Sequence, residues 1–291
     1  MSDDQTIRRS IARTHRPGLR PATRIGLALL LVGGLAACSS DPDAASDATT
    51  TTAKSTASLP EGAEDLVGRW AHYDVVAYEG DLMKTLIIST GFADLELRDG
   101  QLWNVQRFCH ADMGNDQNMA VSLSDDATQA IVPIDTPVEV TEEDGVLRVV
   151  RPATPTPIGI DLDDPANEKL PTDPDDPRIN DADGDGKPGV TAKVEVSEDL
   201  KGEIYLARRE IFSYDVTQES PDRMVGHIVD RSEQTVLGAS NDLFLTQDTW
   251  TQIDDKTRNP VIWQRVDDTW DCERLAEERD QMFPPKPVAD W

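Results

Sequence analysis

Short β-like runs separated by turn residues are the feature that most constrains how this chain can fold. Asp-Gly dipeptides occupy positions 99–100 and 144–145, each between two runs rich in Val and Leu. A two-residue Asp-Gly connection favours a type I′ turn, the geometry that joins two antiparallel strands into a hairpin. The register of each hairpin follows from its turn, so the expected cross-strand pairs are Leu97 with Leu102 and Val140 with Val149.

The rest of the chain after residue 60 supports the same fold class. No repeat of 20–50 residues is present, so the sequence does not support a propeller or a solenoid. One helical pattern covers residues 272–283 and ends at Pro284-Pro285. We therefore predict an all-β fold, an antiparallel barrel or sandwich with one short C-terminal helix. Residues 151–189 form a long, acidic, Pro-rich loop that we do not expect in the packed core. The strand-length runs beyond it are 190–196, 203–212, 224–229, 234–237 and 261–266.

The N-terminus has the pattern of an export signal. Six arginines between positions 8 and 24 precede an apolar run, 25–37, that is too short to span a bilayer. The run ends in Leu-Ala-Ala-Cys38, which resembles the lipobox of bacterial lipoproteins; an ordinary secretory peptide is the alternative. The resemblance implies that residues 1–37 are removed and that Cys38 carries the lipid, labelled by palmitate. Ser39 resembles the class that is sorted to the outer membrane, so we expect a lipid-anchored protein of the bacterial cell envelope.

Composition divides the mature chain and limits its partners. Residues 38–60 hold almost no large apolar side chain, so we interpret them as a disordered tether, with the β domain in 61–291. The chain has 55 acidic against 28 basic residues and a formal net charge of −27. This balance opposes binding to nucleic acid through bulk charge. Contact with the membrane is expected through the N-terminal lipid.

Two cysteines remain once Cys38 is assigned to the lipid. Cys109 and Cys272 form an even pair in an oxidising compartment, and we predict a disulfide between them. The bond would join the C-terminal helix to the first half of the β domain.

The most specific motif for a bound ion is a run of alternating aspartates. Asp181, Asp183 and Asp185 stand at every second position, followed by Gly186. Carboxylates at positions one, three and five with a sharp turn at six suit a hard cation. The run resembles the DxDxDG calcium loops of EF-hands, thrombospondin type 3 repeats and FG-GAP repeats, which implies structural Ca²⁺ with the Lys187 carbonyl as a further ligand. A solvated loop without an ion is the alternative. Position twelve is Ala192, so another acid must complete the site; the candidates are Glu195, Asp173, Asp175 and Asp176.

Other motifs leave the function open. Gly68-Arg69-Trp70 is similar to the GxW signature of lipocalins, which implies a ligand cavity beneath Trp70. The histidines His72, His110 and His227 have acidic neighbours, but no recognised catalytic motif accompanies them. Our first interpretation is a binding or structural role with no catalysis inferred. A lipocalin-like carrier of an apolar ligand is second, and an envelope hydrolase is third. The partner, whether protein, glycan or small apolar ligand, stays open.

Overall fold

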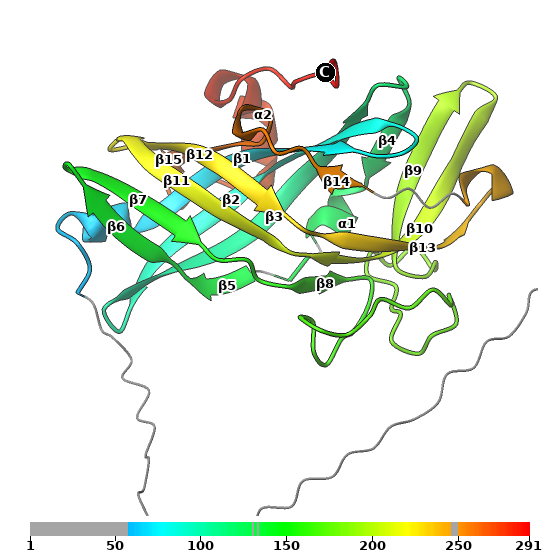
Figure 1. The fold of residues 1–291 in the computed structure, drawn as a ribbon, viewed down its shortest axis with the longest axis horizontal. Helices are drawn as coiled ribbons and strands as arrows, with labels where there is room; N and C mark the ends of the chain where they lie inside the picture. Colours follow the sequence, from blue (N-terminus) through cyan, green and yellow to red (C-terminus); the bar gives the residue numbers. More distant parts are fainter. Residues whose placement is uncertain (1–57, 130, 133, 246–249) are drawn as a thin grey trace, which may run out of the picture. The chain divides into compact units, whose positions relative to one another are not determined.

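A single antiparallel sheet of fifteen strands dominates the computed structural model (Figure 1). The sheet curls into a half-barrel, and one short helix, α2 (Cys272–Met282), lies near the C-terminal end of the chain. The predicted all-β class with a C-terminal helix is therefore confirmed. Along the sheet the strand order is β13-β10-β9-β4-β3-β2-β1-β15-β12-β11-β7-β6, while β14, β5 and β8 pair with β1, β3 and β10.

The structure describes residues 58–129, 131–132, 134–245 and 250–291. The predicted signal peptide, Cys38 and almost all of the tether lie outside these residues. The strands are β1 Gly68–Glu79, β2 Lys84–Arg98, β3 Gln101–Asn115, β4 Ala120–Leu123, β5 Ile134–Pro137, β6 Glu139–Glu143, β7 Val146–Arg151, β8 Thr156–Ile158, β9 Val190–Ser197, β10 Leu200–Glu210, β11 Phe212–Ser220, β12 Arg223–Asp230, β13 Glu233–Ala239, β14 Thr251–Gln252 and β15 Pro260–Val266. The other helical elements are α1 Asp125–Gln129, η1 Ala63–Leu66, η2 Asp242–Phe244 and η3 Lys256–Arg258.

Both Asp-Gly hairpins form as their turns predict. Each turn has positive φ at both central residues, which is the type I′ geometry. Leu97 faces Leu102 across β2 and β3, and Val140 faces Val149 across β6 and β7. Both predicted registers are confirmed.

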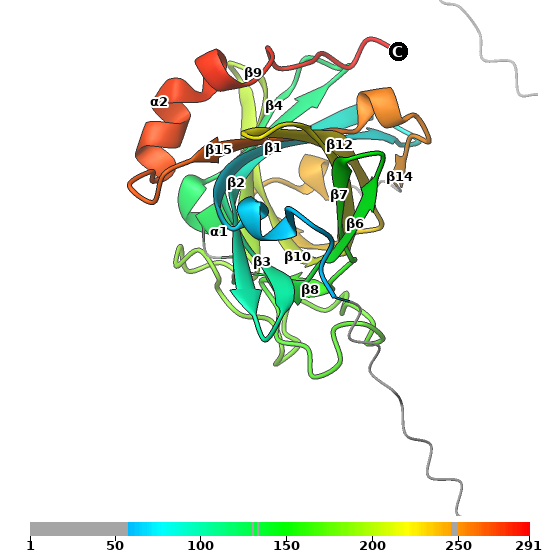
Figure 2. The same cartoon turned by 90° about the vertical axis from the view of Figure 1, so that its left-hand side faces the viewer.

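Strand β1 is buried on both faces, which is why it lies in the middle of the sheet. Its even-numbered side chains, such as Trp70 and Val76, enter the core inside the curl, because alternate residues of a strand share a face. Its odd-numbered ones, such as Tyr73, pack with Leu275 of α2 and Phe283 on the outer face. Figure 2 looks along the curl and shows α2 outside it, with η1 across the end that faces the viewer.

A disulfide fastens α2 to the sheet. Cys109 of β3 and Cys272, the first residue of α2, are bonded, with their Cα atoms 5.3 Å apart. The predicted pairing is confirmed. The side chain of Asp271 accepts a hydrogen bond from the Arg274 N–H and caps the same end of the helix.

The Pro-rich segment is more ordered than its composition suggests. Residues Thr156–Ile158 form β8 and pair with β10, and Ile160 forms a β-bridge with Ile179. Ile158 and Ile160 are buried, and Arg151 at the start of the segment is completely buried. The expectation that residues 151–189 stay out of the core is wrong at this end, because isolated apolar residues among the prolines are enough to pin the chain to β10.

Candidate functional site

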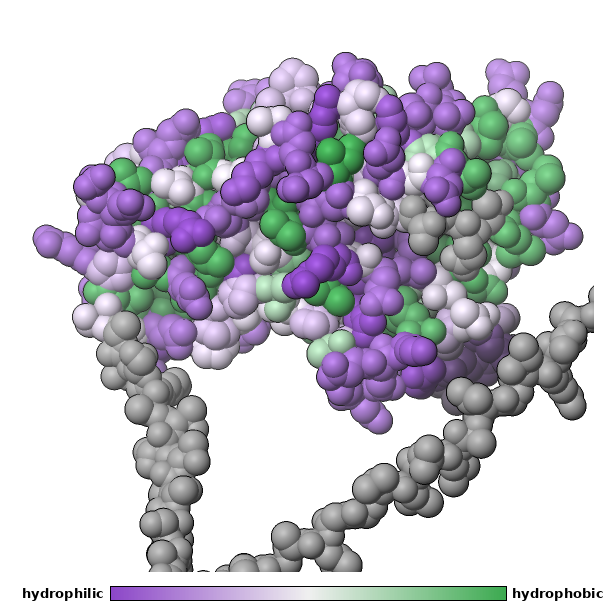
Figure 3. All heavy atoms as spheres, in the orientation of Figure 1, coloured by the Kyte–Doolittle hydropathy of each residue, from purple (hydrophilic) through white to green (hydrophobic). Residues whose placement is uncertain are grey.

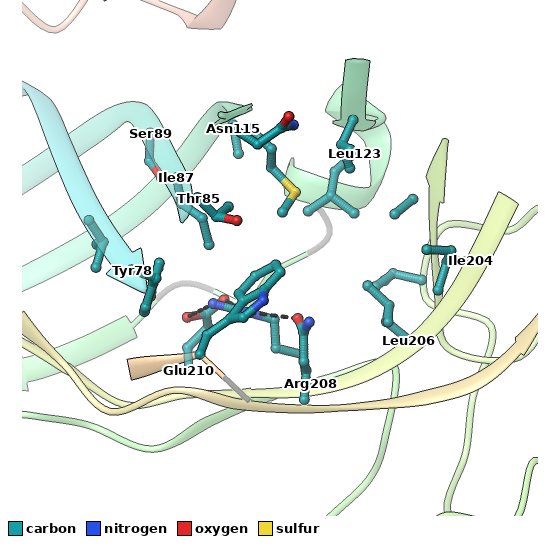
Figure 4. A pocket seen from close by; sticks show the side chains of 18 of the residues that line it. Tyr78, Thr85, Ile87, Ser89, Asn115, Leu123, Ile204, Leu206, Arg208 and Glu210 are labelled. Atoms are coloured by element: carbon teal, nitrogen blue, oxygen red, sulfur yellow. Dashed lines mark hydrogen bonds and ion pairs between the residues drawn. The ribbon is translucent and has the colours of Figure 1, made fainter. Parts of the chain in front are cut away.

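The curl of the sheet encloses a cavity of about 410 Å³. Its walls come from alternate residues of long strands, as the period of two in a β-strand requires. Strand β10 contributes Ile204, Leu206, Arg208 and Glu210 in this alternation. Figure 4 shows the side chains of β10 facing those of β1 and β2 across the space. The other walls include Asp74, Val76 and Tyr78 of β1, Thr85, Ile87 and Ser89 of β2, Met113 of β3, Val190, Ala192 and Val194 of β9, Phe212 and Tyr214 of β11, and Ile228 and Asp230 of β12.

Apolar side chains continue from the cavity to the surface. Leu82 and Leu243 both line the cavity, and they are 56% and 71% exposed. Leu82 belongs to the β1–β2 connection and Leu243 to η2, so the apolar lining reaches the surface at both segments. Figure 3 shows hydrophobic residues at the end of the domain that carries the β9–β10 hairpin, and others scattered among hydrophilic residues over the rest of this face. An apolar space of this size with an apolar entrance has the character of a small-molecule site.

A charged cluster is set into one wall of the cavity. Arg208 forms an ion pair with Glu210, and its Nη1 donates to Gln234 Oε1 at 2.8 Å. The Tyr78 hydroxyl donates to Asp230 Oδ2 at 2.6 Å, and Ser232 Oγ lies 2.8 Å from Glu210 Oε2. Every charged group of the cluster therefore has a protein partner.

Burial sets the protonation of this cluster. Burial, and next the charge of Glu210, raises the pKa of Asp230 above its ordinary value. Burial, and next Asp230, also raises the pKa of Tyr78, which stays a neutral donor. Burial alone lowers the pKa of Arg208, but Glu210 and the other acidic groups outweigh it, so Arg208 stays charged. Arg208 is thus the counter-charge that holds the two carboxylates in the wall.

A second polar network reaches the cavity through Asp74 and Tyr214, which line it, and continues into the core. His72 Nδ1 lies 3.0 Å from Asp74 Oδ1, and the Tyr214 hydroxyl donates to the same oxygen at 2.7 Å. The Arg151 guanidinium stacks 4.4 Å from the Phe212 ring, and burial lowers its pKa to about 10. His72 is completely buried and is not a lining residue, so the His72–Asp74 pair is a hydrogen-bonded part of the core.

The other two histidines lie apart from the cavity. His110 Nε2 lies 3.1 Å from Asp112 and Nδ1 lies 2.6 Å from Asp125. Hydrogen bonding to Asp112 is the largest cause that raises the pKa of His110, to about 9. His227 lies 3.9 Å from Asp215, and burial lowers its pKa. Neither histidine lines the cavity, so the structure does not bring the three histidines together.

The aspartate loop gathers its three carboxylates as its spacing predicts. One oxygen from each of Asp181, Asp183 and Asp185 lies within 4.8 Å of the others, so this triad can hold a metal ion. Gly184 and Gly186 have φ of 70° and 81°, the left-handed conformation that lets the chain wrap round one point. Burial is the main cause that raises the pKa of Asp183, and the charges of Asp185 and Asp181 add to it. A cation between the three carboxylates would offset the free-energy cost of keeping Asp183 charged beside Asp181 and Asp185.

Hydrogen bonds attach this loop to strand β9. The Thr191 N–H donates to Asp183 Oδ2 at 2.9 Å, and the Thr191 hydroxyl donates to Asp185 Oδ2 at 2.6 Å. A Cβ atom at Gly189 would lie 2.1 Å from the Leu206 carbonyl oxygen, so only glycine lets the loop enter β9 this close to β10. The loop is therefore fixed to the back of the cavity wall.

Three of the four acids proposed to complete the ion site have other partners. Glu195 pairs with Lys201, Asp176 pairs with Arg178, and Asp173 accepts from the Asp175 N–H. Within the described chain the cluster of possible ligands contains the triad alone. The side-chain nitrogen of Lys187 lies 5.7 Å from the centre of the Tyr205 ring, directed to a different contact from its backbone carbonyl.

Trp70 sits at the closed end of the curl and does not line the cavity. Its indole is completely buried in the core, and Nε1 donates to the Leu66 carbonyl of η1 at 2.9 Å. The Arg265 guanidinium lies 4.2 Å from the Trp70 ring. Trp70 thus closes one end of the curl, while the cavity occupies the part that β9 and β10 cover.

Sequence reasoning missed most residues of the cavity. The only signal was in residues 204–210, where every second residue lines the cavity, first the apolar Ile204 and Leu206 and then the charged Arg208 and Glu210. The charged half of that run suggests a solvent-facing strand. The role of Arg208 and Glu210 in the cavity wall became visible only when the topology placed Tyr78 and Asp230 beside them.

Comparisons add no relative on which to base a function. None of the described helices is long and apolar enough to cross a bilayer. No protein-family model, no curated protein and no solved structure matches this chain.

Proposed function

We propose that this protein binds a small apolar molecule in the cavity of its curled sheet. The observation that carries the proposal is the cavity of about 410 Å³, whose apolar walls reach an apolar entrance at Leu82 and Leu243. Pockets for small ligands are of this size and are lined by hydrophobic side chains with a few polar groups. A purely structural role would not require an open space in the core, because protein interiors are close-packed.

Binding of a neutral fluorophore tests this function. 1-N-phenylnaphthylamine is expected to bind saturably, with about one molecule per chain. Leu123→Trp and Ile204→Trp place an indole in the cavity and are expected to weaken binding about tenfold or more. Leu97→Trp is the matched control, because Leu97 lies in the β2–β3 hairpin, outside the cavity. Equal binding by the wild type and all three variants, each shown to be folded by its unfolding curve, would contradict the proposal.

We infer further that the triad of Asp181, Asp183 and Asp185 binds Ca²⁺ as a structural ion. Its support is the oxygen-only chemistry of the triad and the glycine turns at Gly184 and Gly186. With three protein carboxylates and the Lys187 carbonyl, the affinity is expected to be weak, with a Kd of about 10⁻⁴ to 10⁻³ M. The ion would brace the loop against β9 through the contacts of Thr191.

Thermal unfolding in calcium or in chelator measures this site. At ten times the dissociation constant, calcium should stabilise the wild type by about 1.4 kcal/mol. Asp183→Asn should abolish the calcium-dependent rise in Tm. Asp175→Asn should retain it, because Asp175 is an exposed acid of the same segment outside the triad. A rise that survives in Asp183→Asn would remove the triad from the site.

The proposed location is the bacterial cell envelope, with a lipid on Cys38 and sorting to the outer membrane. Its support is the Arg-rich N-terminus, the short apolar run and the Leu-Ala-Ala-Cys38 ending. In cells fed labelled palmitate, the wild type should incorporate the label and Cys38→Ala should not. Equal labelling of the two proteins would place the lipid elsewhere.

A further inference from the structure

Two polar atoms at the cavity wall have no partner within the described part of the protein. They are the indole Nε1 of Trp250 and the hydroxyl of Thr85, and both residues line the cavity. Thr85 is only 2% exposed, so bulk water does not satisfy its hydroxyl. A buried donor without an acceptor costs free energy, which a bound molecule can recover.

Thr85 and Trp250 are both neighbours of Tyr78. Thr85 of β2 is the cross-strand partner of Tyr78 in β1, and the Tyr78 ring centre lies 5.8 Å from that of Trp250. The N–H of Trp250 can only donate, whereas the hydroxyl of Thr85 can donate or accept. This region therefore suits a ligand oxygen that accepts hydrogen bonds.

The neighbouring charges argue against an ionised ligand. Arg208 is paired with Glu210 and Gln234, and Asp230 adds a second carboxylate to the cluster. An anionic head group would meet more carboxylates than guanidinium groups, which is repulsive in a cavity of low dielectric. The carboxylates already accept from Tyr78, Ser232 and Arg208, so an ammonium group that gives up its water meets carboxylate oxygens that are already hydrogen-bonded.

We propose that the cavity selects an uncharged amphipathic molecule, with an alcohol, ester or ketone oxygen at Trp250 and Thr85 and a hydrocarbon part along the walls. The apolar part then contacts residues such as Ile87 and Leu206, and the oxygen accepts from the indole N–H. This inference rests on the proposed binding function and names the class of ligand.

Displacement of 1-N-phenylnaphthylamine at pH 7 by dodecanol, dodecanoate and dodecylamine tests the selectivity. The three competitors share a chain and differ in head group. Dodecanol is expected to displace the probe at a concentration about tenfold lower than either ion. Thr85→Val keeps the shape of its side chain, and Trp250→Phe keeps an aromatic ring of smaller size; each removes one polar group. Each variant is expected to weaken the binding of dodecanol about three- to tenfold, the worth of one hydrogen bond. The binding of dodecane, which has no oxygen, should stay unchanged.

Trp103→Phe is the matched control, since Trp103 packs against Arg98 outside the cavity. Displacement by dodecanoate or dodecylamine at concentrations equal to or below that of dodecanol overturns the inference. So does an unchanged dodecanol affinity in both Trp250→Phe and Thr85→Val. If the fluorophore itself does not bind the wild type, the proposed function fails, which is a different result from a wrong order among the competitors.

Discussion

Removing the disulfide between Cys109 and Cys272 is expected to lower the free energy of unfolding by about 2–5 kcal/mol. The bond closes a loop across 163 positions of sequence, so it restricts the unfolded chain strongly. It also holds the first turn of α2, whose Leu275 is completely buried against the outer face of the sheet. Denaturant unfolding of Cys109→Ala/Cys272→Ala against the oxidised wild type measures the effect.

Each single variant should lose as much stability as the double variant, because either substitution removes the same bond. The wild type with reductant should also approach the double variant. A difference below about 1 kcal/mol between oxidised wild type and double variant would mean that packing of α2 alone fixes the C-terminal segment.

Replacing Arg208 is expected to be the most costly change in the cavity wall. Arg208→Met keeps the bulk of the side chain but leaves Glu210 and Asp230 without a counter-charge. The side chains of Arg208 and Glu210 are only 11% and 17% exposed, so the loss is not screened by water as it would be at the surface. Breaking a buried pair in this way costs about 3–5 kcal/mol at neutral pH.

The cost of Arg208→Met should depend on pH in a defined direction. Burial and Glu210 already raise the pKa of Asp230 in the wild type, and removal of Arg208 raises it further. A carboxyl group with a raised pKa in the folded state binds more protons when folded than when unfolded. Stability is therefore lost as the pH rises above about 4, the ordinary pKa of an aspartate. The variant should thus be closest to the wild type near pH 4–5 and furthest from it near pH 7.

Arg98→Met is the matched control for this prediction. Arg98 pairs with Glu96 and Asp135 on an exposed surface, where an ion pair contributes little. Its unfolding curve should overlay that of the wild type at both pH values. A cost for Arg208→Met that is the same at pH 5 and pH 7 would show that lost packing, and not an uncompensated carboxylate, causes the destabilisation.

The local parts of this fold could be predicted from sequence because short-range chemistry decides them. An Asp-Gly turn determines which residue faces which, so the pair Leu97–Leu102 followed from four intervening positions. Aspartates at every second position gather round one point for a similar reason. The side chain of Asp181 accepts from the backbone N–H groups of Asp185 and Gly186 and closes the loop.

The cavity could not be predicted because it depends on contacts between distant strands. Arg151 looks like the first polar residue of a loop, yet it is completely buried with its guanidinium against the ring of Phe212. Nothing in its immediate neighbours predicts a ring 61 positions away. Likewise Tyr78 and Asp230 are 152 positions apart, and only the sheet order brings them to one hydrogen bond.

The place of β1 in the sheet has a consequence for how the chain acquires its structure. β1 is among the first elements of the domain, yet its two long neighbours are β2, which follows at once, and β15, at Pro260–Val266. Until β15 is synthesised, one edge of β1 and one edge of β12 have open backbone hydrogen-bonding groups, because β15 pairs with both. Such edges invite pairing with other chains. The last strand, β15, therefore completes the sheet by joining β1 to β12. A chain released before residue 260 carries two unpaired strand edges that can aggregate.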